Sequence, residues 1–354
     1  MLKNQVTDLL NIHYPIIQAP MAGGITTSQL VSEVCNSGGL GMIGAGYMTP
    51  DQIKQQTREI KQLTTGYFGI NVFVPHAFNV SENNIAFANE KLEPIRKQLH
   101  IQQPENDKIP QSNDWLHTFH EQIKVIIEEQ IPICSFVFGI PSEEIIHALK
   151  QHNIILMGTA TTVSEAIEIE SKGMDIVVVQ GSEAGGHRGN FIKGTPESSI
   201  GLMSLIPQVV DNVDIPIIAA GGIMDGRGLR ASLCLGAQGV QMGTAFITCI
   251  ESGAHQMYKK AIINATEDQI VLTRAFSGKW ARGIENKFIS TMKEYEQSLP
   301  SFPIQNALTQ HIRKTSALQN TTDFMSLWSG QSPRLAKSQH VALLMKSIIN
   351  DIQE

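Results

Sequence analysis

The chain has 354 residues, of which 42% are apolar and 17% are charged, and its formal net charge is −6. This length suits one large domain with an appended piece, or two domains. The mild acidity disfavours nucleic-acid binding, because proteins that bind nucleic acids present concentrated basic patches. The four cysteines are far apart and show no spacing typical of a metal site. We therefore expect buried free thiols in a reducing compartment and no bound metal.

Residues 1–5 lack the basic-then-apolar pattern of a signal peptide. No apolar run reaches the length that crosses a membrane. These features predict a cytoplasmic protein with no membrane partner, and composition alone indicates no oligomeric state.

Strand and helix signals alternate along the first 248 residues. Short apolar runs predict strands at residues 15–20, 40–45, 67–74, 132–139, 154–158, 175–180, 215–220 and 239–242. Helices are expected between them, opened for example by Pro50 and by a capping box of Thr162 with Glu165. Eight such alternations with short connections favour an α/β fold, a TIM (β/α)8 barrel. The alternative is an open doubly wound sheet, which does not require closure at eight strands.

Two stretches break this alternation. Residues 76–112 carry three prolines and little apolar periodicity, so we expect an excursion from the core, part helix and part loop. Beyond about residue 250 the pattern becomes mainly helical. We therefore divide the chain into a barrel at residues 1–248, a helical lid or substrate segment at 249–315, and C-terminal helices at 316–354 that pack back on the barrel.

A glycine-rich loop follows the predicted strand at 175–180. Residues 180–189 contain four glycines and one titratable ring, His187. Glycines let a backbone approach a ligand closely, and histidine is the side chain that most often serves as a general base near neutral pH. Because a barrel builds its active site at the carboxyl ends of its strands, His187 is the first catalytic candidate. The alternative is a surface histidine in a flexible loop.

The exits of the last two predicted strands also carry glycines. They read Ala-Ala-Gly-Gly at 219–222 and Gln-Met-Gly-Thr at 241–244. Barrels often bind a phosphate with these two loops, through backbone N–H groups. Asn71 and Gln180 each end a strand and offer a donor and an acceptor to a heterocycle, although both also suit a strand-end cap. Together these groups fit a phosphorylated cofactor over the mouth of the barrel.

Five stretches carry a recognisable series of motifs, in residues 18–24, 180–187, 219–226, 236–244 and 275–283. Together they resemble the FMN-dependent nitronate monooxygenases, formerly called 2-nitropropane dioxygenases, over nearly the whole chain. The resemblance implies that His187 is the catalytic base and that the backbone of Met21 and Ala22 lies against the flavin ring. It implies FMN contacts for Asn71, Gln180, Gly185, Gly222, Gln241, Met242, Gly243 and Thr244.

The implied reaction is oxidation of an alkyl nitronate, such as propionate 3-nitronate, by O2 to a carbonyl compound and nitrite. A nitronate is already an anion, so His187 would act as a base only for neutral nitroalkanes, or would orient the nitro group. Val137 stands where relatives often have a histidine, which leaves the substrate preference open. The alternatives are a flavin-dependent enoyl-ACP reductase and a non-catalytic barrel that binds a phosphorylated ligand.

Overall fold

The computed structural model describes residues 2–101, 109–192 and 199–353. At its centre lies an eight-stranded parallel sheet in the order β1-β9-β8-β6-β5-β4-β3-β2. Its strands are β1 Ile16–Gln18, β2 Gly41–Gly44, β3 Phe68–Phe73, β4 Ile133–Val137, β5 Ile155–Ala160, β6 Ile176–Gln180, β8 Ile217–Ala220 and β9 Gly239–Met242. All eight predicted strands are therefore confirmed.

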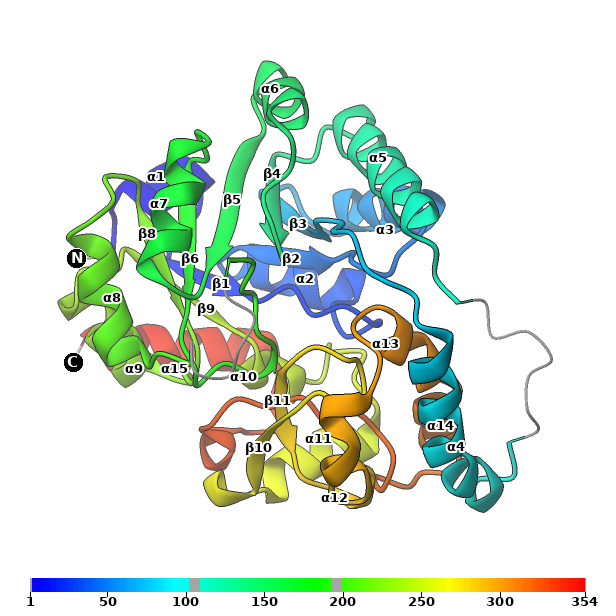
Figure 1. Ribbon diagram of the computed structural model, residues 1–354. Helices are drawn as coiled ribbons and strands as arrows, with labels where there is room; N and C mark the ends of the chain where they lie inside the picture. Colours follow the sequence, from blue (N-terminus) through cyan, green and yellow to red (C-terminus); the bar gives the residue numbers. More distant parts are fainter. Residues whose placement is uncertain (1, 102–108, 193–198, 354) are drawn as a thin grey trace.

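The sheet curls round so that its first and last strands meet. The backbone N–H of Gln18 donates to the carbonyl of Leu40 at 2.9 Å, and the N–H of Leu40 donates to the carbonyl of Ile16 at 3.0 Å. This join just before β2 nearly closes the barrel, and the helices lie outside it (Figure 1). The TIM-barrel prediction is confirmed and the open doubly wound sheet is not what forms.

Up to Cys234, eight helices of the described chain surround the barrel. In order they are α1 Gln5–Leu10, α2 Ser28–Asn36, α3 Pro50–Leu63, α5 Ser112–Glu128, α6 Glu143–Gln151, α7 Val163–Ser171, α8 Leu202–Val210 and α9 Gly226–Cys234. Five of them, α1, α2, α3, α7 and α9, begin at a residue whose side chain caps the first turn. Thr49 and Gln52 form a capping box around Pro50, which occupies the first turn of α3. Apolar strand residues such as Ile17 and Val178 fill the barrel interior, and a second apolar layer joins strands to helices. This packing holds the strand ends, and thus the site, in fixed positions.

A second body lies at one end of the barrel, in the lower half of Figure 1. It contains α4 Glu82–Gln98 from the excursion, α11 Gln256–Asn264, α12 Lys287–Met292, α13 Ile304–Leu308 and α14 Gln310–Leu318, while the short helix α10 Thr244–Ile247 follows β9 and packs in the barrel core through Ala245 and Phe246. The excursion is part helix as predicted, while its residues 102–108 lie outside the described residues. Helix α4 packs with the segment expected to form a lid, because Ala88 and Leu92 share one apolar cluster with Phe276, Phe288 and Leu308.

This second body also contains strands that the sequence analysis did not predict. Strands β10 Ile270–Thr273 and β11 Ala281–Ile284 pair antiparallel, and β11 pairs in turn with β7 Gly186–His187. The lid segment is therefore not purely helical. The loop predicted to carry the catalytic histidine is itself part of the lid sheet.

Helix α15 Val341–Gln353 returns to the barrel at the end of the chain. Leu344, Met345 and Ile348 belong to the same apolar cluster as Leu30 of α2 and Leu229 of α9. In the described parts of the chain, no helix combines the length and the apolar character needed to cross a membrane.

Candidate active site

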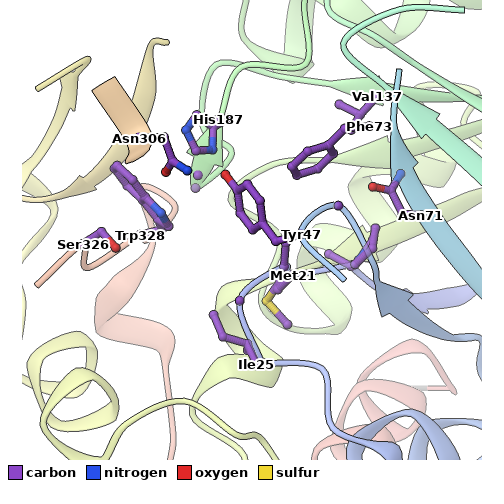
Figure 2. A pocket seen from close by; sticks show the side chains of 18 of the residues that line it. Met21, Ile25, Tyr47, Asn71, Phe73, Val137, His187, Asn306, Ser326 and Trp328 are labelled. Atoms are coloured by element: carbon purple, nitrogen blue, oxygen red, sulfur yellow. The ribbon is translucent and has the colours of Figure 1, made fainter. Parts of the chain in front are cut away.

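A cavity of about 980 Å³ opens between the carboxyl ends of the barrel strands and the lid. Figure 2 shows it from close by. Nine of the ten residues expected at the cofactor line it together with His187: Met21, Ala22, Asn71, Gln180, Gly185, Gly222, Gln241, Gly243 and Thr244. Val137, the residue that departs from the family pattern, also lines it. The structure thus brings together residues that are separated by more than 200 positions in the chain.

Met242 is the one expected contact whose side chain does not reach the cavity. It is buried in the apolar layer between the strands and the helices. Successive residues of a strand face opposite sides, so Gln241 faces the cavity while Met242 faces the helices. Its carbonyl accepts a hydrogen bond from the N–H of Ala19 at 2.8 Å, which ties β9 to the loop after β1.

Gln180 anchors the loop that carries His187. Its amide nitrogen donates to the carbonyl of His187 at 3.0 Å, and its amide oxygen accepts from the N–H of Gly189 at 2.8 Å. Asn71 has a comparable neighbour, because its amide nitrogen donates to the hydroxyl of Ser135 at 2.7 Å. Both residues therefore brace strand ends while also lining the cavity.

His187 lines the cavity from the short strand β7, close to the end of β6. Its Nε2 lies 2.8 Å from the hydroxyl of Ser277, which also lies 3.0 Å from the carbonyl of Lys279. Burial is the main cause that lowers the pKa of His187, and the positive charges of Lys279 and Arg313 lower it further, to about 3. The imidazole is therefore neutral at physiological pH and keeps one nitrogen lone pair, as a base requires.

Aromatic rings surround His187. The ring centroids of Trp328, Phe138 and Phe302 lie 5.4, 6.1 and 6.1 Å from that of the imidazole. Phe138 has a backbone φ of +72°, which is uncommon for a bulky residue and is found most often at functional sites. These rings keep much of the water away from the imidazole and limit the positions it can adopt.

Glu165, on helix α7, holds the loop that follows His187 through hydrogen bonds to its backbone. One carboxylate oxygen accepts from the N–H groups of Phe191 and Ile192 at 2.7 and 3.0 Å. The other accepts from the N–H and the hydroxyl of Thr161 at 2.7 and 2.8 Å. The predicted capping box is therefore only half right: Thr162 does accept from the N–H of Glu165, but the Glu165 side chain reaches the loop after His187 and the residue before the cap.

Several residues on the substrate side were not predicted. Figure 2 shows the hydroxyl of Tyr47 pointing toward the space between His187 and Asn306. Tyr47 follows β2, so the rule that barrel sites lie at strand ends could have found it. Asn306 and Arg313 come from helices of the lid, and no local sequence signal places them over the barrel.

Comparison with known proteins agrees with this geometry. The family model described as nitronate monooxygenase matches residues 3–351. A protein named probable nitronate monooxygenase from Staphylococcus haemolyticus is 51% identical over 352 residues, covering 99% of this chain and 97% of that protein. The chain belongs to the nitronate monooxygenase family. It is accordingly a flavin-dependent oxidoreductase.

Two solved structures resemble this member of the nitronate monooxygenase family over nearly its whole length. Nitroalkane oxidase from Streptomyces ansochromogenes has a TM-score of 0.90 and 35% identity, covering 98% of this chain and 97% of that one. FabK from Thermotoga maritima has a TM-score of 0.78 and 30% identity, covering 100% and 97%. Both sequence and geometry therefore lie closer to the nitroalkane oxidase than to FabK.

Proposed function

We propose that this enzyme uses bound FMN to oxidise alkyl nitronates with O2 to a carbonyl compound and nitrite. The observation that carries the proposal is a neutral His187 on the wall of a cavity that also reaches the glycine loops after β8 and β9. A base and a site for a phosphorylated cofactor thus share one space, as the reaction requires. Propionate 3-nitronate and ethylnitronate are suitable substrates for a test.

The residues that line the cavity fit FMN. The volume of about 980 Å³ lies at the upper end of the ~300–1,000 Å³ range of cofactor sites. A Cβ added to Gly243 would meet only Ala19 and Met21, at 3.7 and 3.8 Å, so the backbone there is open to a close approach. The hydroxyl of Thr244 accepts from the N–H of Gly330 at 2.9 Å and keeps its own hydrogen to donate.

The side chain of Glu183 packs against Gly222, but its carboxylate is turned toward the start of α8. Both oxygens of Glu183 accept from the N–H of Leu202, at 2.9 and 3.2 Å, at the start of α8. The carboxylate of Asp225, in the same loop, is likewise engaged, because it accepts from the N–H groups of Arg227 and Gly228 and from the Arg227 side chain. A phosphate near Gly222 would therefore not face either carboxylate in a free state. At Gly185 the requirement for glycine has another cause, because a Cβ there would lie 2.5 Å from the backbone of Ser329 and Gly330.

We propose that the residues expected at the cofactor hold FMN, with the contact of Met242 made by its backbone. FMN, when bound, would supply the two-electron redox chemistry and the reactivity with O2. His187 would remove the α-proton of a neutral nitroalkane or orient the nitro group. Residues 249–315 would act as the lid, since Phe302 and Asn306 come from it.

Two measurements test the proposal. The purified protein is expected to be yellow with a flavin spectrum, and to release nitrite from ethylnitronate and propionate 3-nitronate. A colourless protein that takes up no FMN on titration would contradict the cofactor assignment. Steady-state NADH oxidation with crotonyl thioesters and no nitrite release would instead indicate the enoyl-ACP reductase.

Replacing Gly243 with Ala is expected to weaken FMN binding without harming the fold. The backbone φ of −105° is accessible to alanine, and the added methyl meets its protein neighbours at ordinary distances. The methyl would occupy space that the cofactor needs, and such overpacking costs about 1–3 kcal/mol, or about 5–150-fold in Kd. FMN titration measures the effect, and the thermal midpoint of the FMN-free protein is the control. Unchanged affinity would place the cofactor elsewhere. Gly222 is a poorer choice for this test, because its φ of +65° strains any side chain.

A further inference from the structure

The hydroxyl of Ser277, in the turn between β10 and β11, is the centre of a small hydrogen-bond network next to His187. It lies 2.8 Å from Nε2 of His187, 3.0 Å from the carbonyl oxygen of Lys279 and 3.3 Å from the backbone nitrogen of Lys279. Ser277 is 1% exposed and does not line the cavity. Water therefore has little access to this hydroxyl, and its bonding capacity is met by these protein groups.

One arrangement of hydrogens satisfies all of these contacts. A carbonyl oxygen can only accept, so the single hydrogen of the Ser277 hydroxyl goes to the carbonyl of Lys279. The N–H of Lys279 donates to the hydroxyl oxygen, which can accept one more hydrogen bond. His187 must supply that hydrogen from Nε2. In the opposite arrangement, Ser277 would donate to Nε2 and face the Lys279 carbonyl at 3.0 Å with no hydrogen between the two oxygens.

The other ring nitrogen of His187, Nδ1, then carries the lone pair of the neutral imidazole. The two nitrogens of an imidazole point away from each other, so Nδ1 is turned away from Ser277. His187 lines the cavity, and no described residue forms a hydrogen bond with its Nδ1. Figure 2 shows the imidazole beside the space toward which the Tyr47 hydroxyl points. The unprotonated nitrogen is thus the one available to a molecule in the cavity.

We propose that Ser277 is a positioning residue that fixes His187 in the tautomer with its hydrogen on Nε2, so that Nδ1 takes the α-proton of a neutral nitroalkane. This inference rests on the proposed function. The electron pair of the C–H bond passes to the nitro group and gives the nitronate anion, while the proton on Nδ1 converts the imidazole to an imidazolium. Nε2–H donates to Ser277 before and after the transfer, so the network needs no rearrangement during the reaction.

The tautomer can be measured without any turnover. In holoenzyme whose histidines are labelled with ¹⁵N, long-range ¹H–¹⁵N correlations distinguish the protonated ring nitrogen from the unprotonated one, and His187→Asn identifies the signals of His187. We expect the wild type to carry the hydrogen on Nε2. A neutral ring with its hydrogen on Nδ1, or a ring protonated on both nitrogens at neutral pH, would overturn the proposal.

Turnover gives a second test. In Ser277→Ala, the ratio of kcat/KM for nitroethane to that for ethylnitronate is expected to fall about 2–10-fold, the contribution of one hydrogen bond between neutral groups. The ratio falls because only the neutral nitroalkane needs a base. Ser277→Thr keeps the hydroxyl and is expected to recover part of the ratio.

The matched control is Ser316→Ala. Ser316 is also buried, donates to the carbonyl of Thr321 at 2.7 Å and accepts from the N–H of Phe324 at 3.3 Å, but it does not line the cavity, so the ratio should stay as in the wild type. FMN content and thermal midpoint of each variant report folding. Equal losses on both substrates in Ser277→Ala, an unchanged ratio, or the same fall in Ser316→Ala would overturn the proposal. Absence of nitrite release by the wild type would overturn the proposed function, while the NMR result still decides the tautomer.

Discussion

Turnover of neutral nitroethane is expected to fall by ~10²–10⁴-fold when His187 is replaced with Asn, the contribution typical of a positioned base. Turnover of ethylnitronate should fall far less, because a nitronate has already lost its α-proton. The neutral imidazole next to Ser277 has the lone pair that this proton transfer needs. Nitrite release from both substrates at one pH gives the two losses, and the flavin spectrum serves as the control. Equal losses of turnover on the two substrates would show that His187 binds the nitro group and is not a base. No loss on either substrate would show that His187 takes no part in the reaction.

The pH dependence of the same reaction is an independent check. A base must be unprotonated, so the rate falls as the pH drops through the pKa of His187. That pKa is lowered from 6.5 to about 3, so the histidine stays neutral in mildly acidic solution. We therefore expect kcat/KM for neutral nitroethane to show no loss of rate around pH 6–7 from this group. An acid limb near 6.5 that disappears in His187→Asn would contradict the environment described for the imidazole.

Replacing Glu165 with Gln is expected to lower the free energy of unfolding by about 1–3 kcal/mol, the cost of leaving a buried hydrogen-bond donor unsatisfied. The buried carboxylate accepts four hydrogen bonds, two on each oxygen. In glutamine one oxygen becomes an NH2 group, which would face N–H donors that then have no acceptor.

Denaturant unfolding measures this loss. Glu168→Gln is the matched control, since Glu168 lies on the same helix α7 but is exposed, and exposed substitutions usually stay within about 0.5 kcal/mol. A loss below about 1 kcal/mol for Glu165→Gln would show that the loop after His187 does not depend on this carboxylate.

Most of the barrel could be predicted because its strands are buried on both faces. Such strands appear as continuous apolar runs, as in Ile176–Gln180, and glycines mark their exits. The same rule predicted that the residues expected at the cofactor lie together, because strand ends meet at one end of a barrel. Met242 shows where that rule stops. The sequence motif predicts which loop lies at the cavity, but the alternation of side chains along the strand decides that Gln241 faces the cavity and Met242 faces the helices.

The lid and the substrate side could not be predicted in the same way. Strands β10, β11 and β7 have four, four and two residues, and His187 pairs with Ala281, far away in the chain. Strand pairs between residues so far apart in the chain produce no pattern within a short stretch of sequence. Asn306 and Arg313 reach the cavity only because the lid has its own apolar core, in which Phe276 stacks on Phe288 at 4.2 Å.

The pairing of β7 with β11 couples His187 mechanically to the segment that carries β10 and β11. The N–H of Arg188 donates to the carbonyl of Trp280 at 2.9 Å, and Gly186 and His187 lie opposite Arg282 and Ala281. If β11 swung outward as a rigid flap, it would either pull His187 off the wall or break these backbone bonds. We therefore expect the pairing of β7 with β11 to stay intact while substrate and product pass along another side of the cavity. With this pairing intact, the position of the His187 imidazole would not depend on movement elsewhere in the segment.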